Sequence, residues 1–76
     1  MILVLGATGT NGREVVLRLA AAGQRVRAMV RNPNKAGDLR IENVELAQGD
    51  LDDPRSLEAA LAGVGSAFFV SSVDSL

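Results

Sequence analysis

Three glycines stand three residues apart near the start of the chain, in the run Gly6-Ala7-Thr8-Gly9-Thr10-Asn11-Gly12. The first permits a tight turn, the second lets the backbone approach a bound group with no Cβ in the way, and the third allows a helix to pack close to a strand. Backbone N–H groups at a helix start also carry partial positive charge and attract anions. We expect a pyrophosphate cradle whose candidate residues are Gly6, Thr8, Gly9, Thr10, Asn11 and Gly12. The alternative is a turn rich in glycine for its geometry alone.

The segments on either side of this turn have the patterns that such a cradle needs. Ile2 to Leu5 is a continuous apolar run, typical of a short strand buried on both faces. From Asn11 the apolar residues fall at helical spacing, Thr10 or Asn11 can cap the helix start, and Gly23 supplies its left-handed end. The sequence therefore predicts a strand, a glycine-rich turn and a helix in succession.

Three more strands and a second long helix are expected downstream. In the second strand Val26, Ala28 and Val30 alternate with arginines, which indicates either one polar-tipped face or a position near the sheet edge. Residues 34–40 predict a single irregular helical turn, and Val44 to Ala47 a third strand. Asp53-Pro54 begins a helix with the apolar stripe Leu57, Ala60 and Leu61 and an end at Gly63. Ala67 to Val70 predicts the fourth strand.

This alternation predicts an α/β fold, a partial Rossmann unit whose four-stranded parallel sheet has the order 3-2-1-4 and flanking helices. We expect residues 1–76 to be the N-terminal half of a dinucleotide-binding domain, truncated so that the C-terminal half is absent. The fourth strand would lie at an edge although it is as apolar as a central strand. Either the chain is a fragment, or it self-associates through that strand.

The residue after the second strand distinguishes two dinucleotides. An acid there bonds the ribose 2′-hydroxyl of NAD, whereas an arginine accommodates the 2′-phosphate of NADP. The chain has Arg31, which can bind phosphate with two parallel hydrogen bonds, and Lys35 can add a second charge. NADP is therefore the expected cofactor and NAD the less favoured one. The alternative is that both side chains are ordinary solvated charges.

The Gly-x-x-Gly-x-x-Gly spacing, with Val30-Arg31-Asn32-Pro33 and Gly49-Asp50-Leu51, resembles the NmrA-like branch of the atypical, extended-type short-chain dehydrogenase/reductases. The resemblance implies that the Asp50 carboxylate accepts from the adenine amino group and that Leu51 covers a ring face. It places Ser71 or Ser72 where the cofactor crosses toward its nicotinamide. The alternatives are that Asp50 bonds its own backbone in a turn and that the serines simply end a strand. Asp52 and Asp53 are expected to cap the following helix.

The resemblance also implies the N-terminal part of an NADP-dependent oxidoreductase. Such reductases use a Tyr-x-x-x-Lys pair, and this chain has no tyrosine, so no catalytic residue is assigned and the chain alone is expected to be inactive. One alternative is a dinucleotide-sensing regulator without catalysis. Another is a structural or engineered half-Rossmann unit that self-associates.

Composition excludes several other classes of function. The chain has no cysteine or histidine, so neither a disulfide framework nor a thiolate or imidazole metal site is expected, and a reduced, cytoplasmic location fits. Its net charge is −1 with basic and acidic residues interspersed, which argues against a nucleic-acid partner. We expect no signal peptide and no membrane partner, because no apolar run approaches the length of a span.

Overall fold

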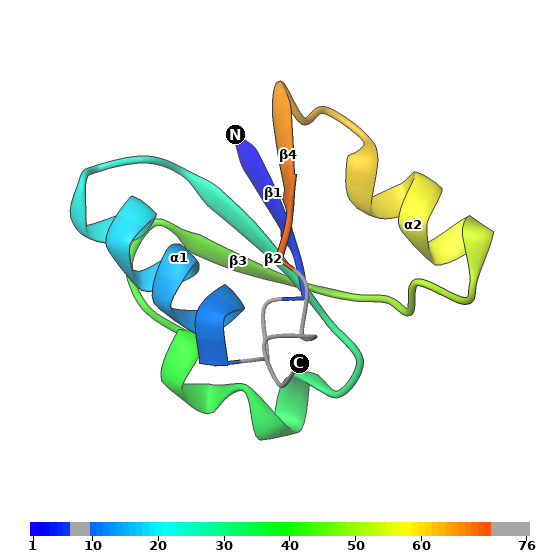
Figure 1. Cartoon of the computed structure of the whole chain (residues 1–76), viewed down its shortest axis with the longest axis horizontal. Helices are drawn as coiled ribbons and strands as arrows, with labels where there is room; N and C mark the ends of the chain where they lie inside the picture. The colour runs from blue at the N-terminus through cyan, green and yellow to red at the C-terminus, as the bar shows by residue number, and fades with distance from the viewer. Residues whose placement is uncertain (7–9, 71–76) are drawn as a thin grey trace.

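Four parallel strands form one sheet in the spatial order β3-β2-β1-β4 (Figure 1). The strands are β1 (Ile2–Leu5), β2 (Val26–Val30), β3 (Val44–Gln48) and β4 (Ser66–Phe69). The computed structural model describes residues 1–6 and 10–70. The predicted α/β class and strand order are therefore confirmed, and each predicted strand lies within a residue of its expected place.

The two long helices, α1 (Thr10–Ala21) and α2 (Pro54–Leu61), cover opposite faces of this sheet (Figure 1). On one face Val16 of α1 joins buried side chains of β1 and β2, including Val4 and Ala28. On the other face Ala60 of α2 packs with Leu3 and Met29. Because β1 and β2 are buried on both sides, their side chains divide between two thin aliphatic layers.

Residues 33–39 form two short 3-10 turns, η1 (Pro33–Lys35) and η2 (Gly37–Leu39), where the sequence predicted one irregular turn. The Asn32 side chain caps η1 by accepting from the Asn34 N–H at 3.1 Å. Ala36 and Leu39 are completely buried and join the core on the α1 face. Two tight turns bring both of these apolar side chains to the sheet, while the polar residues between them stay exposed.

Most of the residues predicted to begin or end a helix do so. Gly23 has the left-handed φ of 83° expected at the end of α1, and Asp53 caps α2 by accepting from the Arg55 N–H at 3.1 Å. Asp52 was expected to share this role, but the N-cap of α2 is Asp53, and Asp52 lies in the preceding turn, where its N–H donates to Asp50 Oδ1 at 2.9 Å. Leu61 was expected in the apolar stripe of α2, yet it is 44% exposed, because α2 buries only one narrow face.

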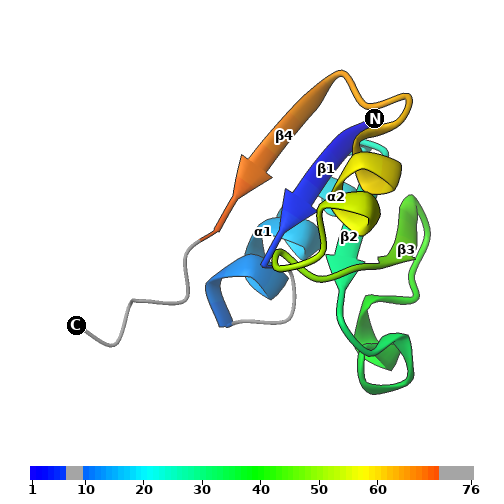
Figure 2. The same ribbon diagram turned by 90° about the vertical axis from the view of Figure 1, so that its right-hand side faces the viewer.

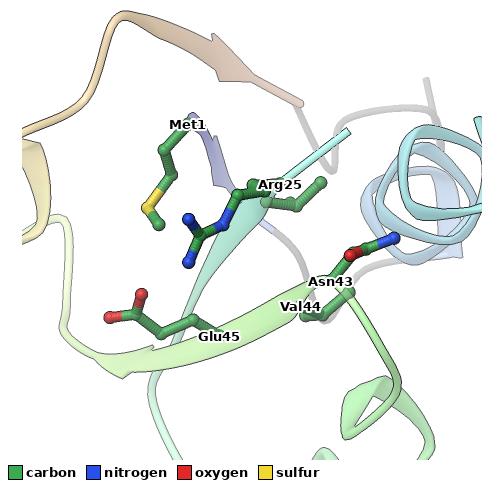
Figure 3. A pocket seen from close by; sticks show the side chains of 6 residues that line it. Met1, Arg25, Asn43, Val44 and Glu45 are labelled. Atoms are coloured by element: carbon green, nitrogen blue, oxygen red, sulfur yellow. The ribbon is translucent and has the colours of Figure 1, made fainter. Parts of the chain in front are cut away.

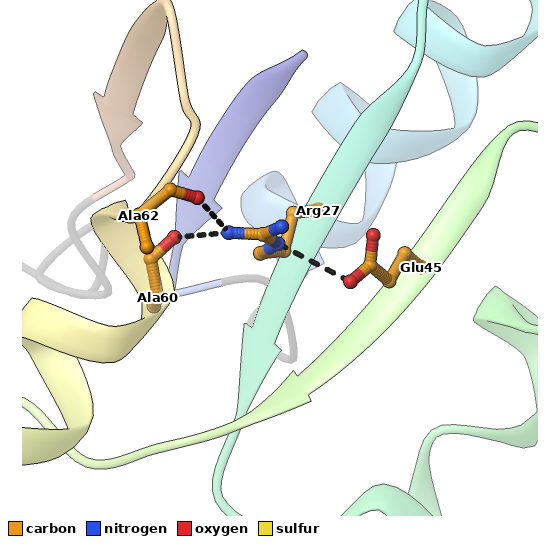
Figure 4. A network of polar contacts seen from close by, with 4 residues as sticks. All are labelled: Arg27, Glu45, Ala60 and Ala62. Atoms are coloured by element: carbon orange, nitrogen blue, oxygen red, sulfur yellow. Dashed lines mark hydrogen bonds and ion pairs between the residues drawn. The ribbon is translucent and has the colours of Figure 1, made fainter.

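The one polar residue of β2 is Arg27, and β2 lies inside the sheet and not at its edge. Its Nη1 donates to the carbonyls of Ala60 at 2.9 Å and Ala62 at 2.7 Å, and its Nε lies 3.4 Å from Glu45 Oε1 (Figure 4). A cation there is stabilised by the negative end of the α2 dipole. The polar-tipped face predicted for β2 is thus the face that holds α2 in place.

The sheet ends at β4, which pairs only with β1 among the described elements (Figure 2). All four of its residues are exposed, with Phe68 at 49% and Phe69 at 62%. Phe68 pairs with Val4 and Phe69 with Leu5, so the two rings project from opposite faces of the sheet. The predicted apolar edge strand is therefore present.

Candidate functional site

Three of the predicted site residues lie where the parallel strands end. Gly6 follows β1, Arg31 follows β2, and Asp50 lies two residues beyond β3. Carboxyl ends of parallel strands meet at one edge of a sheet, and in open α/β folds ligands bind outside that edge. The order of the strands thus brings together residues that are more than forty positions apart in the sequence.

Gly6 is required by two separate features of the backbone. Its φ is 77°, in the left-handed region that favours glycine. A Cβ there would also collide with the carbonyl oxygen of Val70. The Val70 N–H donates to Leu5 O at 3.0 Å, so β4 runs close beside the place where the chain leaves β1. The sequence predicted the tight turn but not this close approach, because Val70 is remote in the chain.

The helix end of the glycine-rich turn is only partly described. α1 begins at Thr10, and Gly12 in its first turn is buried, as expected where a helix packs close to a strand. Asn11 is exposed and takes part in a polar interaction. Thr8, Gly9 and Ser71, and the side chain of Thr10, lie outside the described residues, and so does Ser72. Their assignment to the site stays a prediction.

A hollow of about 380 Å³ opens at the ends of β2 and β3. Its lining contains two predicted site residues, Arg31 and Asp50, together with Gln48, Gly49, Asp53 and Ser56. Two other predicted residues lie outside this lining: Lys35 is exposed on η1, and Leu51 is 46% exposed on the loop after β3. The hollow thus combines one guanidinium with two carboxylates.

Ser56 organises the loop on one side of this hollow. Its hydroxyl accepts from the Asp50 N–H at 2.9 Å, and its own hydrogen lies within reach of Asp50 O at 3.0 Å and Asp53 O at 2.9 Å. The Asp50 carboxylate accepts from the Asp52 N–H through Oδ1. This bond to its own turn is the alternative role that the sequence offered for Asp50. Ser56 was missed by sequence reasoning, because its role depends on the conformation of the loop at Asp50 and not on a local sequence pattern.

Gly49 also lines the hollow, and from the sequence it was noted only as part of the Gly49-Asp50-Leu51 motif, with no role of its own. It is buried, and a Cβ there would lie 2.7 Å from Met29 Sδ and 2.9 Å from Met29 Cγ. Glycine thus leaves room for Met29 beneath the floor of the hollow. The sequence around Gly49 does not indicate this contact, because Met29 lies in the neighbouring strand β2.

A second hollow, of about 350 Å³, lies at the opposite end of the sheet. Figure 3 shows the side chains that line it. It is lined by Met1, Arg25, Val26, Asn43, Val44 and Glu45. These residues surround the amino ends of the strands, where ligands of parallel α/β sheets do not usually bind. The hollow at Arg31 and Asp50 is therefore the better candidate site.

Two other kinds of site find no support in residues 1–6 and 10–70. No group of three or more acidic side chains is placed to hold a metal ion there. None of the helices in these ranges is long and apolar enough to cross a membrane.

The model of the NmrA-like family matches residues 1–75 of this chain. The NAD(P)H azoreductase of Xenophilus azovorans is 49% identical over 71 residues, which cover 93% of this chain and 25% of that protein. The NADPH-dependent quinone oxidoreductase QOR2 of Escherichia coli, solved with NADPH, superposes with a TM-score of 0.84 at 36% identity, over 97% of this chain and 27% of that one.

A short-chain dehydrogenase/reductase superfamily protein from Agrobacterium tumefaciens, solved with NAD, gives a TM-score of 0.76 at 34% identity, over 93% of this chain and 20% of that one. These proteins are NAD(P)-binding reductases with a Rossmann fold. The chain spans only 20% to 27% of their length.

The double constraint on Gly6 gives a prediction with a matched control. Gly23→Ala imposes a side chain at a positive φ but meets no atom within 4 Å, so it should cost about 1 kcal/mol of unfolding free energy. Gly6→Ala adds the collision with Val70 and should cost about 2–4 kcal/mol. Urea unfolding of the two variants measures the difference. Equal losses would show that β4 does not press against Gly6.

Proposed function

The chain belongs to the NmrA-like family, and from that premise we propose that it forms the NADP-binding part of a reductase. The observation that carries the proposal is the meeting of Arg31 and Asp50 in one hollow at the carboxyl ends of β2 and β3. A dinucleotide lying across the sheet edge passes this hollow with its adenosine half. When bound, the cofactor supplies the hydride of the reaction.

In this proposal Arg31 and Lys35 hold the 2′-phosphate. Arg31 lines the hollow but is itself exposed, so its guanidinium can turn to an anion at the rim. The cap at Asn32 and a 3.5 Å hydrogen bond from Arg40 Nη2 to Pro33 O shape the turn that carries Lys35. A guanidinium can bind phosphate with two bonds, and an ammonium adds a point charge. The residue directly after β2 is Arg31 and not an acid, so no carboxylate at that position repels the phosphate.

The hollow itself suits the neutral adenine ring better than the phosphate, because its carboxylates outnumber its guanidinium. Asp50 Oδ1 is occupied by the Asp52 N–H, and we assign the other carboxylate oxygen to the adenine amino group. The exposed Leu51 would cover a face of the ring. Ser56 fixes the backbone of Asp50 and so helps to aim its carboxylate.

The glycine-rich turn would hold the pyrophosphate through backbone N–H groups between Gly6 and Gly12. Gly6 ends β1 with its φ of 77°, and only three residues separate it from the start of α1. In the same proposal Ser71 lies toward the nicotinamide. The absence of cysteine supports a cytoplasmic location, where thiols stay reduced and disulfides are rare.

The role of Arg31 is tested by comparing cofactors in a calorimetric titration. Arg31→Ala should weaken NADP and adenosine 2′,5′-bisphosphate binding by about 1.5–3 kcal/mol, the range for a hydrogen bond to a charged group, and leave NAD nearly unchanged. Arg25→Ala removes the same charge beside the opposite hollow and serves as the control. The assignment fails if both cofactors lose equally or if Arg25→Ala has the same effect.

A second proposal concerns the outer edge of β4, which pairs with no further strand among residues 1–6 and 10–70. We propose that the 76-residue chain pairs there with a second copy of itself, because an edge strand is a template for pairing with another chain and the exposed rings of Phe68 and Phe69 could flank an added strand on both faces. An identical edge on the partner allows a two-fold symmetric pairing of β4 with β4. In a longer chain, a later segment would compete for this edge.

Sedimentation velocity over a range of concentrations tests the pairing. The chain should form a dimer as its concentration rises, whereas Phe69→Lys should remain a monomer, because a charge on an edge strand opposes strand addition. Leu61→Lys, at an exposed leucine of α2, should still dimerise. A monomer at every concentration would refute the proposal.

A further inference from the structure

An ion pair joins the start of α1 to the second 3-10 turn. Arg13 Nε lies 2.6 Å from Asp38 Oδ2, with the arginine side chain 35% exposed and the aspartate 52%. The Nε atom itself is buried and makes no well-aligned hydrogen bond, so the contact is mainly ionic. Partial shielding from water strengthens such a pair relative to one that is fully solvated.

The two partners belong to different parts of the proposed cofactor site. Arg13 follows Gly12, the last glycine of the turn assigned to the pyrophosphate. Asp38 follows Lys35 by three residues and lies in the segment that begins at Arg31. The contact therefore connects the pyrophosphate side of the site to the 2′-phosphate side.

Apart from this ion pair, residues 31–40 are held to the rest of the protein mainly by two buried side chains. Further along the segment, Asn43 Nδ2 donates to the Ala20 carbonyl of α1 at 3.4 Å. Ala36 and Leu39 anchor it to the core, while every residue from 31 to 40 except these two and Pro33 is exposed. Buried apolar side chains hold a turn against the sheet, but they constrain its movement along the sheet surface less, because hydrophobic contacts are not directional. The Arg13–Asp38 ion pair restrains this movement along the sheet surface.

We propose that the Arg13–Asp38 ion pair is a positioning device that sets the spacing between the two phosphate-binding parts and so favours NADP over NAD. Arg13 acts through Asp38 and does not touch the cofactor. This inference rests on the proposed dinucleotide binding. NAD lacks the 2′-phosphate, so its binding does not depend on the position of the segment that carries Lys35.

Asp38→Asn tests the proposal because simple electrostatics predicts the opposite result. Removing a negative charge near an anionic ligand should tighten NADP binding, whereas loosening the segment should weaken it. We expect NADP to bind about three- to fivefold more weakly, the most that a partly exposed ion pair can account for, with NAD unchanged. Glu14→Gln removes the same charge from the 2.7 Å Glu14–Arg18 pair on the exposed side of α1 and should change neither.

The double mutant separates positioning from direct contact. If the pair acts as a unit, Arg13→Gln combined with Asp38→Asn should weaken NADP no more than either change alone. Tighter NADP binding by Asp38→Asn, or a loss confined to Arg13→Gln, would overturn the positioning role and indicate that Arg13 meets the phosphate itself.

Hydrogen exchange of the free chain gives a readout that needs no cofactor. The Leu39 and Arg40 N–H groups donate to Ala36 O and Gly37 O within η2, and Asp38→Asn should speed their exchange while Glu14→Gln does not. Unchanged exchange would contradict the proposal. Failure of the unaltered chain to bind either dinucleotide, with exchange changed as expected, would instead refute the proposed function and leave the structural role of the pair intact.

Discussion

The close packing of β1 between β2 and β4 is the constraint on which the rest of the structure depends. Leu3 and Val4 are completely buried on opposite faces of this strand, so β1 cannot bend until it leaves the sheet. At that point β4 is still alongside, and the carbonyl of Val70 occupies the space where a Cβ on residue 6 would lie. Glycine allows the chain to turn there as it leaves β1.

Most of the fold could be predicted because its signals are local. Short aliphatic runs marked the strands, Gly23 and Asp53 marked helix ends, and the alternation of elements gave a parallel sheet. What the sequence left open or missed depends on contacts between distant residues. Of the two alternatives for β2, the polar-tipped face is correct, because Arg27 binds carbonyl groups of α2 more than thirty residues away and β2 does not lie at an edge. Residues 33–39 form two turns because Ala36 and Leu39 both reach the core, which spacing alone did not indicate.

In the candidate site, too, the roles that depend on local sequence could be predicted and those that depend on distant contacts could not. Arg31 and Asp50 were chosen from their places after strands, and the topology brings both to one hollow. Ser56 was missed, and Gly49 was noted only within a motif, because the role of Ser56 depends on a loop conformation and that of Gly49 on Met29 in a neighbouring strand. The Asp50 carboxylate supports its own loop through the Asp52 N–H, so a structural task and the proposed contact with adenine can share one side chain. Thr8, Gly9 and Ser71 remain predictions from the sequence.

The central claim is that the edge formed by the ends of β1, β2 and β3 receives a dinucleotide. Nuclear magnetic resonance of the isotopically labelled chain during titration with NADP tests it most directly, because every backbone N–H reports separately. The account predicts saturable shifts in the glycine-rich turn from Gly6 to Gly12, at Arg31 and at Asp50, with little change around Arg25 and Glu45 at the opposite end of the sheet. Shifts confined to that opposite end, or none at millimolar NADP, would contradict it.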